Sequence, residues 1–112
     1  ELEFPYAPNG IIGMECAVGL YIKALVEPGH ISWSKLVHMM STRPAEVLRL
    51  HRGTLKTGAV ADVTIIDPNL EWTVDPSQFK SKSRNTPFGG WKLKGRPITT
   101  IVNGEVKWEL HR

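Results

Sequence analysis

The amino-acid sequence predicts an α/β chain that is helical in its first half and forms strands in its second half. Residues 13–27 place apolar side chains on nearly every side of a helix, whereas the segments after Gly53 are rich in β-branched residues and turn formers. Helices followed by strands fit either one α+β domain or the end of one domain joined to another. The first helix favours the second alternative, because the other predicted elements are too few to cover it.

Three helices are expected in the first half. Residues 13–27 form the first, and the sequence EPGH at 27–30 ends it. A third helix would begin at a Thr42 cap and extend to Leu50. Between them, Ser32 is a suitable N-cap for a second helix. The apolar face of this second helix would consist of Trp33, Leu36, Val37 and Met40.

The second half contains short strand candidates separated by an irregular connector. ADVTIID at 61–67 is β-branched and ends in an Asp-Pro turn signal, and EWTV at 71–74 is a second short candidate. Residues 76–95 contain two prolines and three glycines among serine and asparagine residues, which indicates an ordered connection without regular structure.

A hairpin is the clearest local feature of the second half. Asn103 and Gly104 lie between two alternating segments, which is typical of a two-residue type I′ turn whose central residues need positive φ. One face of the predicted hairpin is apolar and the other is polar. The pairs expected on the apolar face are Ile101 with Val106 and Thr99 with Trp108.

Composition excludes several classes of function. The chain has 112 residues and a net charge of +3, but no run of five basic residues, so we expect no nucleic-acid partner. Charged residues interrupt its only long apolar stretch and the first residues lack the basic start of a signal peptide, so we expect a soluble, cytoplasmic protein without a membrane partner. The single cysteine, Cys16, is expected in the core.

Few side chains suggest chemistry. The four histidines show no metal-ligand spacing, and Asp62, Asp67 and Asp75 lie beside strands and turns, where aspartate usually hydrogen-bonds the local backbone. We therefore expect no catalytic residue and no metal ligand in this chain. The exception is the tip formed by Asn9 and Gly10, where backbone groups would be open to a small planar ligand.

Several motifs carry a resemblance over essentially the whole chain. APNGIIGMEC at 7–16, GxxADxxxxD at 58–67 and SKSRNTPF at 81–88 resemble segments of dihydroorotases of the long bacterial type, in the amidohydrolase superfamily. The second motif is shared with hydantoinases and allantoinases, and the Pro-Asn-Gly loop is similar in dihydropyrimidinases. The first and third motifs together point more specifically to dihydroorotase.

The resemblance implies a metal-dependent (β/α)₈ barrel with a small β-sandwich. Residues 1–53 would supply the substrate loop and the closing helices of the barrel, and residues 54–112 would supply part of the sandwich with a connector packed on the barrel. The implied activity is reversible cyclisation of N-carbamoyl-L-aspartate to L-dihydroorotate in pyrimidine synthesis. By the same resemblance, Asn9 and Gly10 contact this substrate.

The family's zinc ligands and catalytic aspartate match nothing in the chain, and would lie upstream of it. The implied partner is thus the remainder of the same polypeptide, and this segment alone should be inactive. A homodimer and a complex with aspartate carbamoyltransferase are left open. Alternatives are a dihydropyrimidinase, hydantoinase or allantoinase relative, a non-catalytic scaffold for aspartate carbamoyltransferase, and an independent small β-rich binding module.

Overall fold

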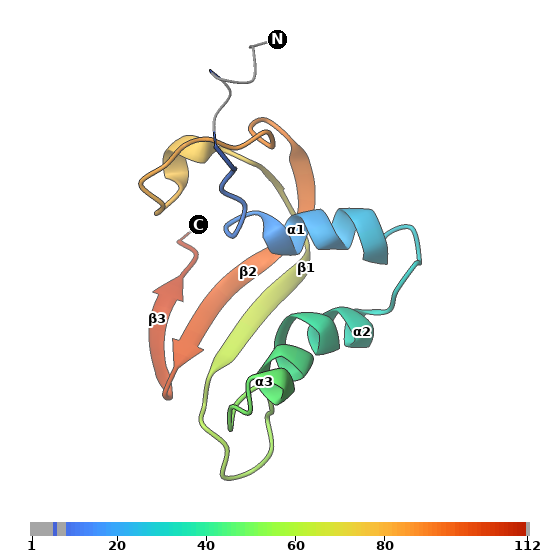
Figure 1. The fold of residues 1–112 in the computed structure, drawn as a ribbon, viewed down its shortest axis with the longest axis vertical. Helices are drawn as coiled ribbons and strands as arrows, with labels where there is room; N and C mark the ends of the chain where they lie inside the picture. Colours follow the sequence, from blue (N-terminus) through green and yellow to red (C-terminus); the bar gives the residue numbers. More distant parts are fainter. Residues whose placement is uncertain (1–5, 7–8, 112) are drawn as a thin grey trace.

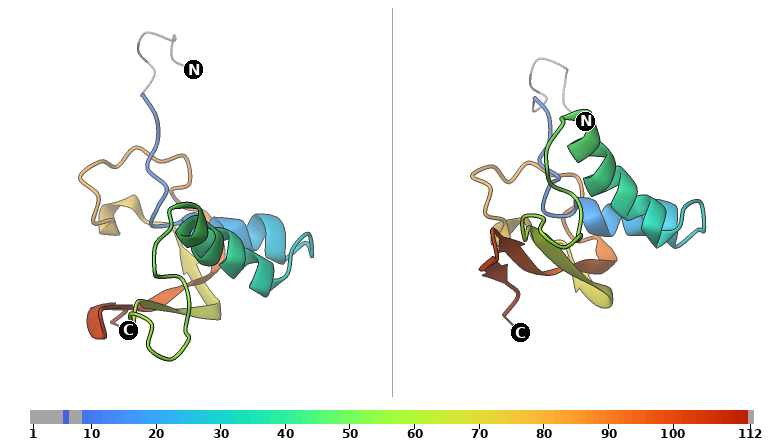
Figure 2. Two further views of the ribbon diagram at one scale, coloured as in Figure 1. Left: turned by 60° about the horizontal axis from the view of Figure 1, so that its bottom comes forward. Right: turned by 90° about the horizontal axis from the view of Figure 1, so that it is seen from below.

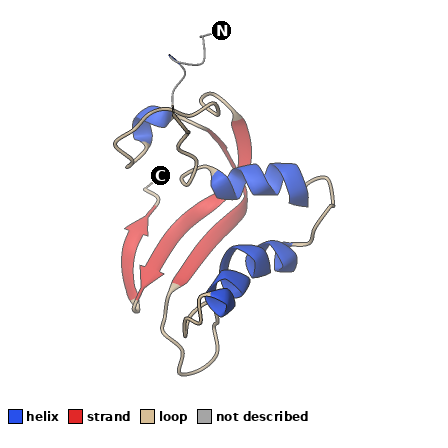
Figure 3. Ribbon diagram, viewed as in Figure 1, coloured by secondary structure: helices blue, strands red, loops and turns tan. Residues whose placement is uncertain are grey.

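The structure, a computed structural model, describes residues 6 and 9–111 of the chain. Helical segments are followed by a three-stranded antiparallel sheet of order β1-β2-β3 (Figure 1). The helices lie on one side of this sheet (Figure 2), and the loops that join the elements are shown in Figure 3. The elements are α1 (Ala17–Tyr21), η2 (Ile22–Val26), α2 (Trp33–Val37), η3 (His38–Thr42), α3 (Arg43–Val47), β1 (Val63–Thr73), η4 (Pro76–Gln78), β2 (Lys92–Val102) and β3 (Glu105–Glu109).

The first predicted helix is confirmed, although it begins later than expected. α1 continues directly into η2, a wider π-helical turn in which the Glu27 amide donates to the Ile22 carbonyl at 2.9 Å. One side of this helix is buried, since Cys16 and Ile22 are 0% and 2% exposed. Met14, just before it, is 93% exposed. The chain's own sheet thus covers only part of the apolar surface at this helix.

Close contact between α1 and β2 joins the helical half to the sheet. A Cβ atom on Gly19 would lie 3.0 Å from the Leu93 side chain and 3.2 Å from both the Gly95 carbonyl oxygen and the Trp72 ring. The Trp72 indole N–H donates to that same carbonyl at 3.2 Å, and the Arg96 guanidinium lies 4.5 Å from the centre of the Trp72 ring. Only glycine allows the helix to approach the strand this closely.

A small core lies beneath the start of α1. Free cysteine is among the most buried residue types, and Cys16 occupies the centre of this core, as the sequence predicts. Its buried members are the residue before α1, the residue after β1, the residue after η4 and one residue of β2: Cys16, Val74, Phe79 and Leu93. Ile12, Leu20, Trp72 and Phe88 pack around them. None of the helices in the described part of the chain is long and apolar enough to span a membrane.

The second helical run differs from its prediction in burial. Ser32 caps α2 as expected, with its hydroxyl accepting from the Lys35 amide at 3.2 Å. Of the predicted apolar face, however, only Leu36 is buried, at 3% exposure, whereas Val37 and Met40 are 51% and 41% exposed. Helical periodicity identifies an apolar face but not the surface that covers it.

The predicted third helix is not separate. Residues 33–47 form one continuous helical run, in which Thr42 has helical φ and ψ of −62° and −51° and makes no capping bond. The Thr42 hydroxyl instead donates to the Gly53 carbonyl at 3.3 Å. The π-helical turn η3 ends at Thr42, two residues before Pro44, and its wider turn is compatible with a residue that lacks an amide hydrogen. The predicted Thr42 cap is therefore wrong.

The two predicted strands at 61–67 and 71–74 are one bent strand. β1 pairs with β2 on both sides of a bulge, with Asp67 opposite Arg96 and Glu71 opposite Lys94. Within the bulge an Asp67 carboxylate oxygen accepts from the Asn69 amide at 2.9 Å. The Asp-Pro pair thus marks a bulge rather than a turn, because the side chain satisfies an amide that the ladder cannot. β2 begins inside the predicted connector.

The predicted turn of the hairpin is confirmed, but the strand pairing farther from the turn differs from the prediction by one residue. The two central residues have φ of 51° and 79°, as a type I′ turn requires, and Ile101 lies opposite Val106. A bulge then places Trp108 opposite Thr100 rather than the predicted Thr99. One extra residue on β3 accounts for the shift, and pattern alone does not locate such a residue.

The packing of η2 on β2 predicts a specific loss of stability. Gly95 and Gly90 have φ of 81° and 80°, but only a Cβ on Gly95 would collide, at 2.5 Å from the buried Ile22 side chain. Gly90→Ala should cost about 1 kcal/mol from backbone strain alone. Gly95→Ala should cost about 1–3 kcal/mol more through overpacking. Calorimetric melting temperatures of both variants of the complete protein measure this, and equal shifts would contradict it.

Candidate functional site

The predicted ligand-contact tip, Asn9 and Gly10, is exposed. Gly10 has a φ of +78°, a conformation that favours glycine, and a Cβ there would meet nothing within 4 Å. Ile11 follows with 60% exposure. Backbone groups at this tip are thus accessible within the described part of the chain, and residues 7 and 8 of the same motif lie outside it. The structure provides no test of ligand contact itself.

Asn85, in the SKSRNTPF motif, holds this tip from across the chain. Its side-chain amide donates to the Gly10 carbonyl, and its own backbone carbonyl accepts from the Ile12 amide at 2.9 Å. The connector, drawn in yellow and orange in Figure 1, passes beside the start of the described chain. From the sequence, a connector packed on the barrel is favoured over a functional role for this motif, because nothing local to residue 85 indicates a partner 75 positions away.

Glu15 makes a second attachment between the same two segments. One of its carboxylate oxygens accepts from the Lys80 amide at 2.9 Å and the other from the Ser81 amide at 3.0 Å. Hydrogen bonds to an ionised acceptor are stronger than neutral ones. The loop at 9–15 is therefore bound to the connector at both of its ends, and sequence reasoning missed Glu15 for the same reason as Asn85.

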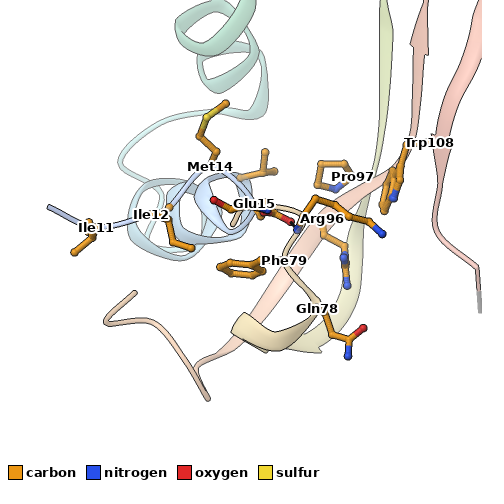
Figure 4. A pocket seen from close by; sticks show the side chains of 13 residues that line it. Ile11, Ile12, Met14, Glu15, Gln78, Phe79, Arg96, Pro97 and Trp108 are labelled. Carbon is orange, nitrogen blue, oxygen red and sulfur yellow. Dashed lines mark hydrogen bonds between the residues drawn. The ribbon is translucent and has the colours of Figure 1, made fainter. Parts of the chain in front are cut away.

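A cavity of about 800 Å³ lies beside this loop. Figure 4 shows Ile11 and Ile12 at one end of it and Trp108 of β3 at the other, with Glu15, Phe79 and Arg96 between them. Partial burial lowers the pKa of the Arg96 guanidinium. The lining is mainly apolar, and this concave surface suits packing against protein as well as a ligand.

Asp67 and Asp75 bond the local backbone, as expected, whereas Asp62 bonds residues that are distant in the sequence. Asp62 pairs with Arg52 and accepts from the Asn103 amide at 2.9 Å, which ties the helical half to the hairpin turn. Asp75 accepts from the Ser77 amide at 2.9 Å, and its hydrogen bonds with Ser77 lower the pKa of its carboxyl group. The conspicuous aspartates of GxxADxxxxD, Asp62 and Asp67, thus hold a turn and a bulge.

Metal-ligating side chains do not converge in the described residues. No three histidine, cysteine, aspartate or glutamate side chains there lie close enough together to hold a metal ion. Burial raises the pKa of the Cys16 thiol and so disfavours the reactive thiolate. Within the described residues, the open tip, its two attachments and the cavity beside them form the candidate site.

Comparison with known proteins identifies the family. The amidohydrolase family matches residues 6–107. The chain belongs to the amidohydrolase family. Dihydroorotases of Citrifermentans bemidjiense and Syntrophotalea carbinolica are 51% and 52% identical to this amidohydrolase chain, over 97% and 98% of it. The chain spans only 26% of the length of each of these curated relatives. The resemblance to dihydroorotases is thereby confirmed.

Solved structures of the family show the same fold. The L-hydantoinase (dihydropyrimidinase) of Arthrobacter aurescens matches 92% of the amidohydrolase chain with a TM-score of 0.84 and 35% identity. A D-hydantoinase (dihydropyrimidinase) of a Thermus species matches 92% with a TM-score of 0.80 and 30% identity. The chain covers 23% of each. Family and likeness together confirm the predicted α/β class, as part of a protein of the (β/α)₈-barrel superfamily.

The two interactions of Asp62 predict that two substitutions there lower the stability by different amounts. Asp62→Asn keeps an oxygen acceptor for the Asn103 amide but loses the ion pair with Arg52, which should cost at most about 1 kcal/mol at this exposed position. Asp62→Ala loses both and should cost about 1 kcal/mol more. Melting temperatures of the two variants of the complete protein provide the comparison. Identical losses would show that the bond to Asn103 contributes nothing.

Proposed function

We propose that this chain is the C-terminal segment of a dihydroorotase, which interconverts N-carbamoyl-L-aspartate and L-dihydroorotate in the cytoplasm. The observation that carries the proposal is about 50% identity to dihydroorotases over nearly the whole chain, against 35% to the L-hydantoinase. A dihydropyrimidinase or hydantoinase activity is the second candidate, supported by the likeness of folds.

The exposed apolar side chains support a place within a longer polypeptide. We assign residues 1–53 to the barrel and residues 54–112 to the β-sandwich. The helical run from α2 to α3 leaves apolar side chains on its surface, and the remainder of a fourfold longer chain would cover them. The side chains concerned are Val37, Met39, Met40 and Val47 in the run, and Leu48 and Leu50 directly after it.

Zinc, the metal implied by the family resemblance, would be held outside this chain. The described residues do not fit a metal site, because they contain no cluster of suitable ligands. The chain's contribution would instead be to bind substrate. At an exposed tip with positive φ, the backbone of Asn9 and Gly10 can approach a planar ring without obstruction from a side chain at position 10.

The deciding experiment compares the complete polypeptide with this segment. The complete protein, supplied with zinc, should convert dihydroorotate to carbamoyl aspartate, and the segment alone should not. Faster turnover of dihydrouracil or hydantoin would favour the second candidate, and faster turnover of allantoin would favour an allantoinase. Inactivity together with absence of bound zinc would favour the non-catalytic scaffold for aspartate carbamoyltransferase, and sizing with and without that enzyme would reveal such a complex or a homodimer.

Gly10→Val tests the substrate loop in the complete enzyme. A β-branched residue is disfavoured at a φ of +78°, so the tip must change shape, and we expect the Michaelis constant for dihydroorotate to rise about tenfold, equivalent to about 1.4 kcal/mol. Gly58→Val is the matched control, because Gly58 has a φ of +86° and equally open surroundings outside the loop. An unchanged Michaelis constant in Gly10→Val would remove Asn9 and Gly10 from the substrate site.

A further inference from the structure

We propose that Asn85 is a positioning residue, which sets the direction of the backbone groups that the Asn9–Gly10 tip presents to substrate. The inference rests on the proposed function of the tip. Its basis is the pair of bonds that Asn85 makes, one from its side chain to the Gly10 carbonyl and one from the Ile12 amide to its own carbonyl.

The first bond orients a whole peptide group. In a trans peptide the carbonyl and the following N–H point in opposite directions, and no cis peptide occurs in the described chain. Holding the Gly10 carbonyl on Asn85 therefore turns the Ile11 amide N–H away from the connector. Ile11 as a residue is 60% exposed, so an amide turned away from the connector can donate to a carbonyl or carboxylate oxygen of a ligand on the open side of the loop.

The tip needs this contact because glycine itself restricts the backbone conformation only weakly. Gly10 occupies open space, where a Cβ would meet nothing within 4 Å, so packing does not select its conformation. Glycine also populates positive and negative φ about equally. The bond from Asn85 is the described contact that acts on the Gly10 carbonyl directly, whereas the bonds of Glu15 to Lys80 and Ser81 hold the other end of the loop.

Asn85→Asp in the complete enzyme separates positioning from folding. Aspartate has the same shape but cannot donate when ionised, and its charge would face the Gly10 carbonyl. The backbone bond from Ile12 remains. We expect the Michaelis constant for dihydroorotate to rise roughly three- to tenfold, as for loss of one hydrogen bond, with a smaller change in kcat. Asn85→Ala, which adds no charge, should raise it in the same direction.

Lys82→Gln is the matched control, because Lys82 is an exposed residue of the same connector whose substitution leaves both bonds of Asn85 in place. It should change neither constant. A purely structural role for Asn85 would lower the melting temperature and the apparent kcat while leaving the Michaelis constant unchanged, and that result would overturn the inference.

Hydrogen exchange supplies a readout that does not depend on activity. In Asn85→Asp, but not in Lys82→Gln, amides in residues 9–12 should exchange faster. An inactive wild-type enzyme would refute the proposed function and leave this readout to decide the positioning role. Unchanged exchange in Asn85→Asp would overturn that role, and so would an unchanged Michaelis constant in an active enzyme.

Discussion

The close packing of α1 on β2 at Gly19 is the contact on which the arrangement of this chain depends. At Gly19 the helix backbone lies so close to Leu93, Gly95 and Trp72 that a Cβ atom there would be 3.0–3.2 Å from them. This contact holds the helical half against the sheet. The absence of a side chain at Gly19 is what permits this distance. Cys16 then falls into the core beside Val74. The described residues directly before α1, from 9 to 16, are positioned by this docking.

The position of the candidate loop, residues 9–15, depends on that contact. With the start of α1 fixed over β2, Glu15 reaches the backbone amides of Lys80 and Ser81, and the preceding loop lies against Asn85. The loop therefore combines an open tip with a supported base. Such a combination suits a group that must contact a small ligand, since rigid placement lowers the conformational cost of binding.

The second helical run exposes apolar side chains that the sheet does not cover. Apolar side chains along α2, η3 and α3 are exposed although they repeat with helical spacing, and only Leu36 and Ala45 in this run are buried. Within 112 residues the sheet is too small to cover a second helical layer. The curated dihydroorotases that the chain matches are about four times as long, and a chain of that length would supply further elements for these helices to pack on.

Local chemistry in the sequence determined the helix starting after Ser32, the turn at Asn103 and Gly104, the core position of Cys16, the family and an exposed tip at Gly10. Each depends on neighbouring residues or on a motif. Tertiary structure alone decided the union of residues 33–47 into one helix, the bulges in β1 and β3, and the bonds of Glu15 and Asn85 to segments more than 60 residues away. Bulges and long-range bonds follow from how complete surfaces fit together, which a local pattern does not contain.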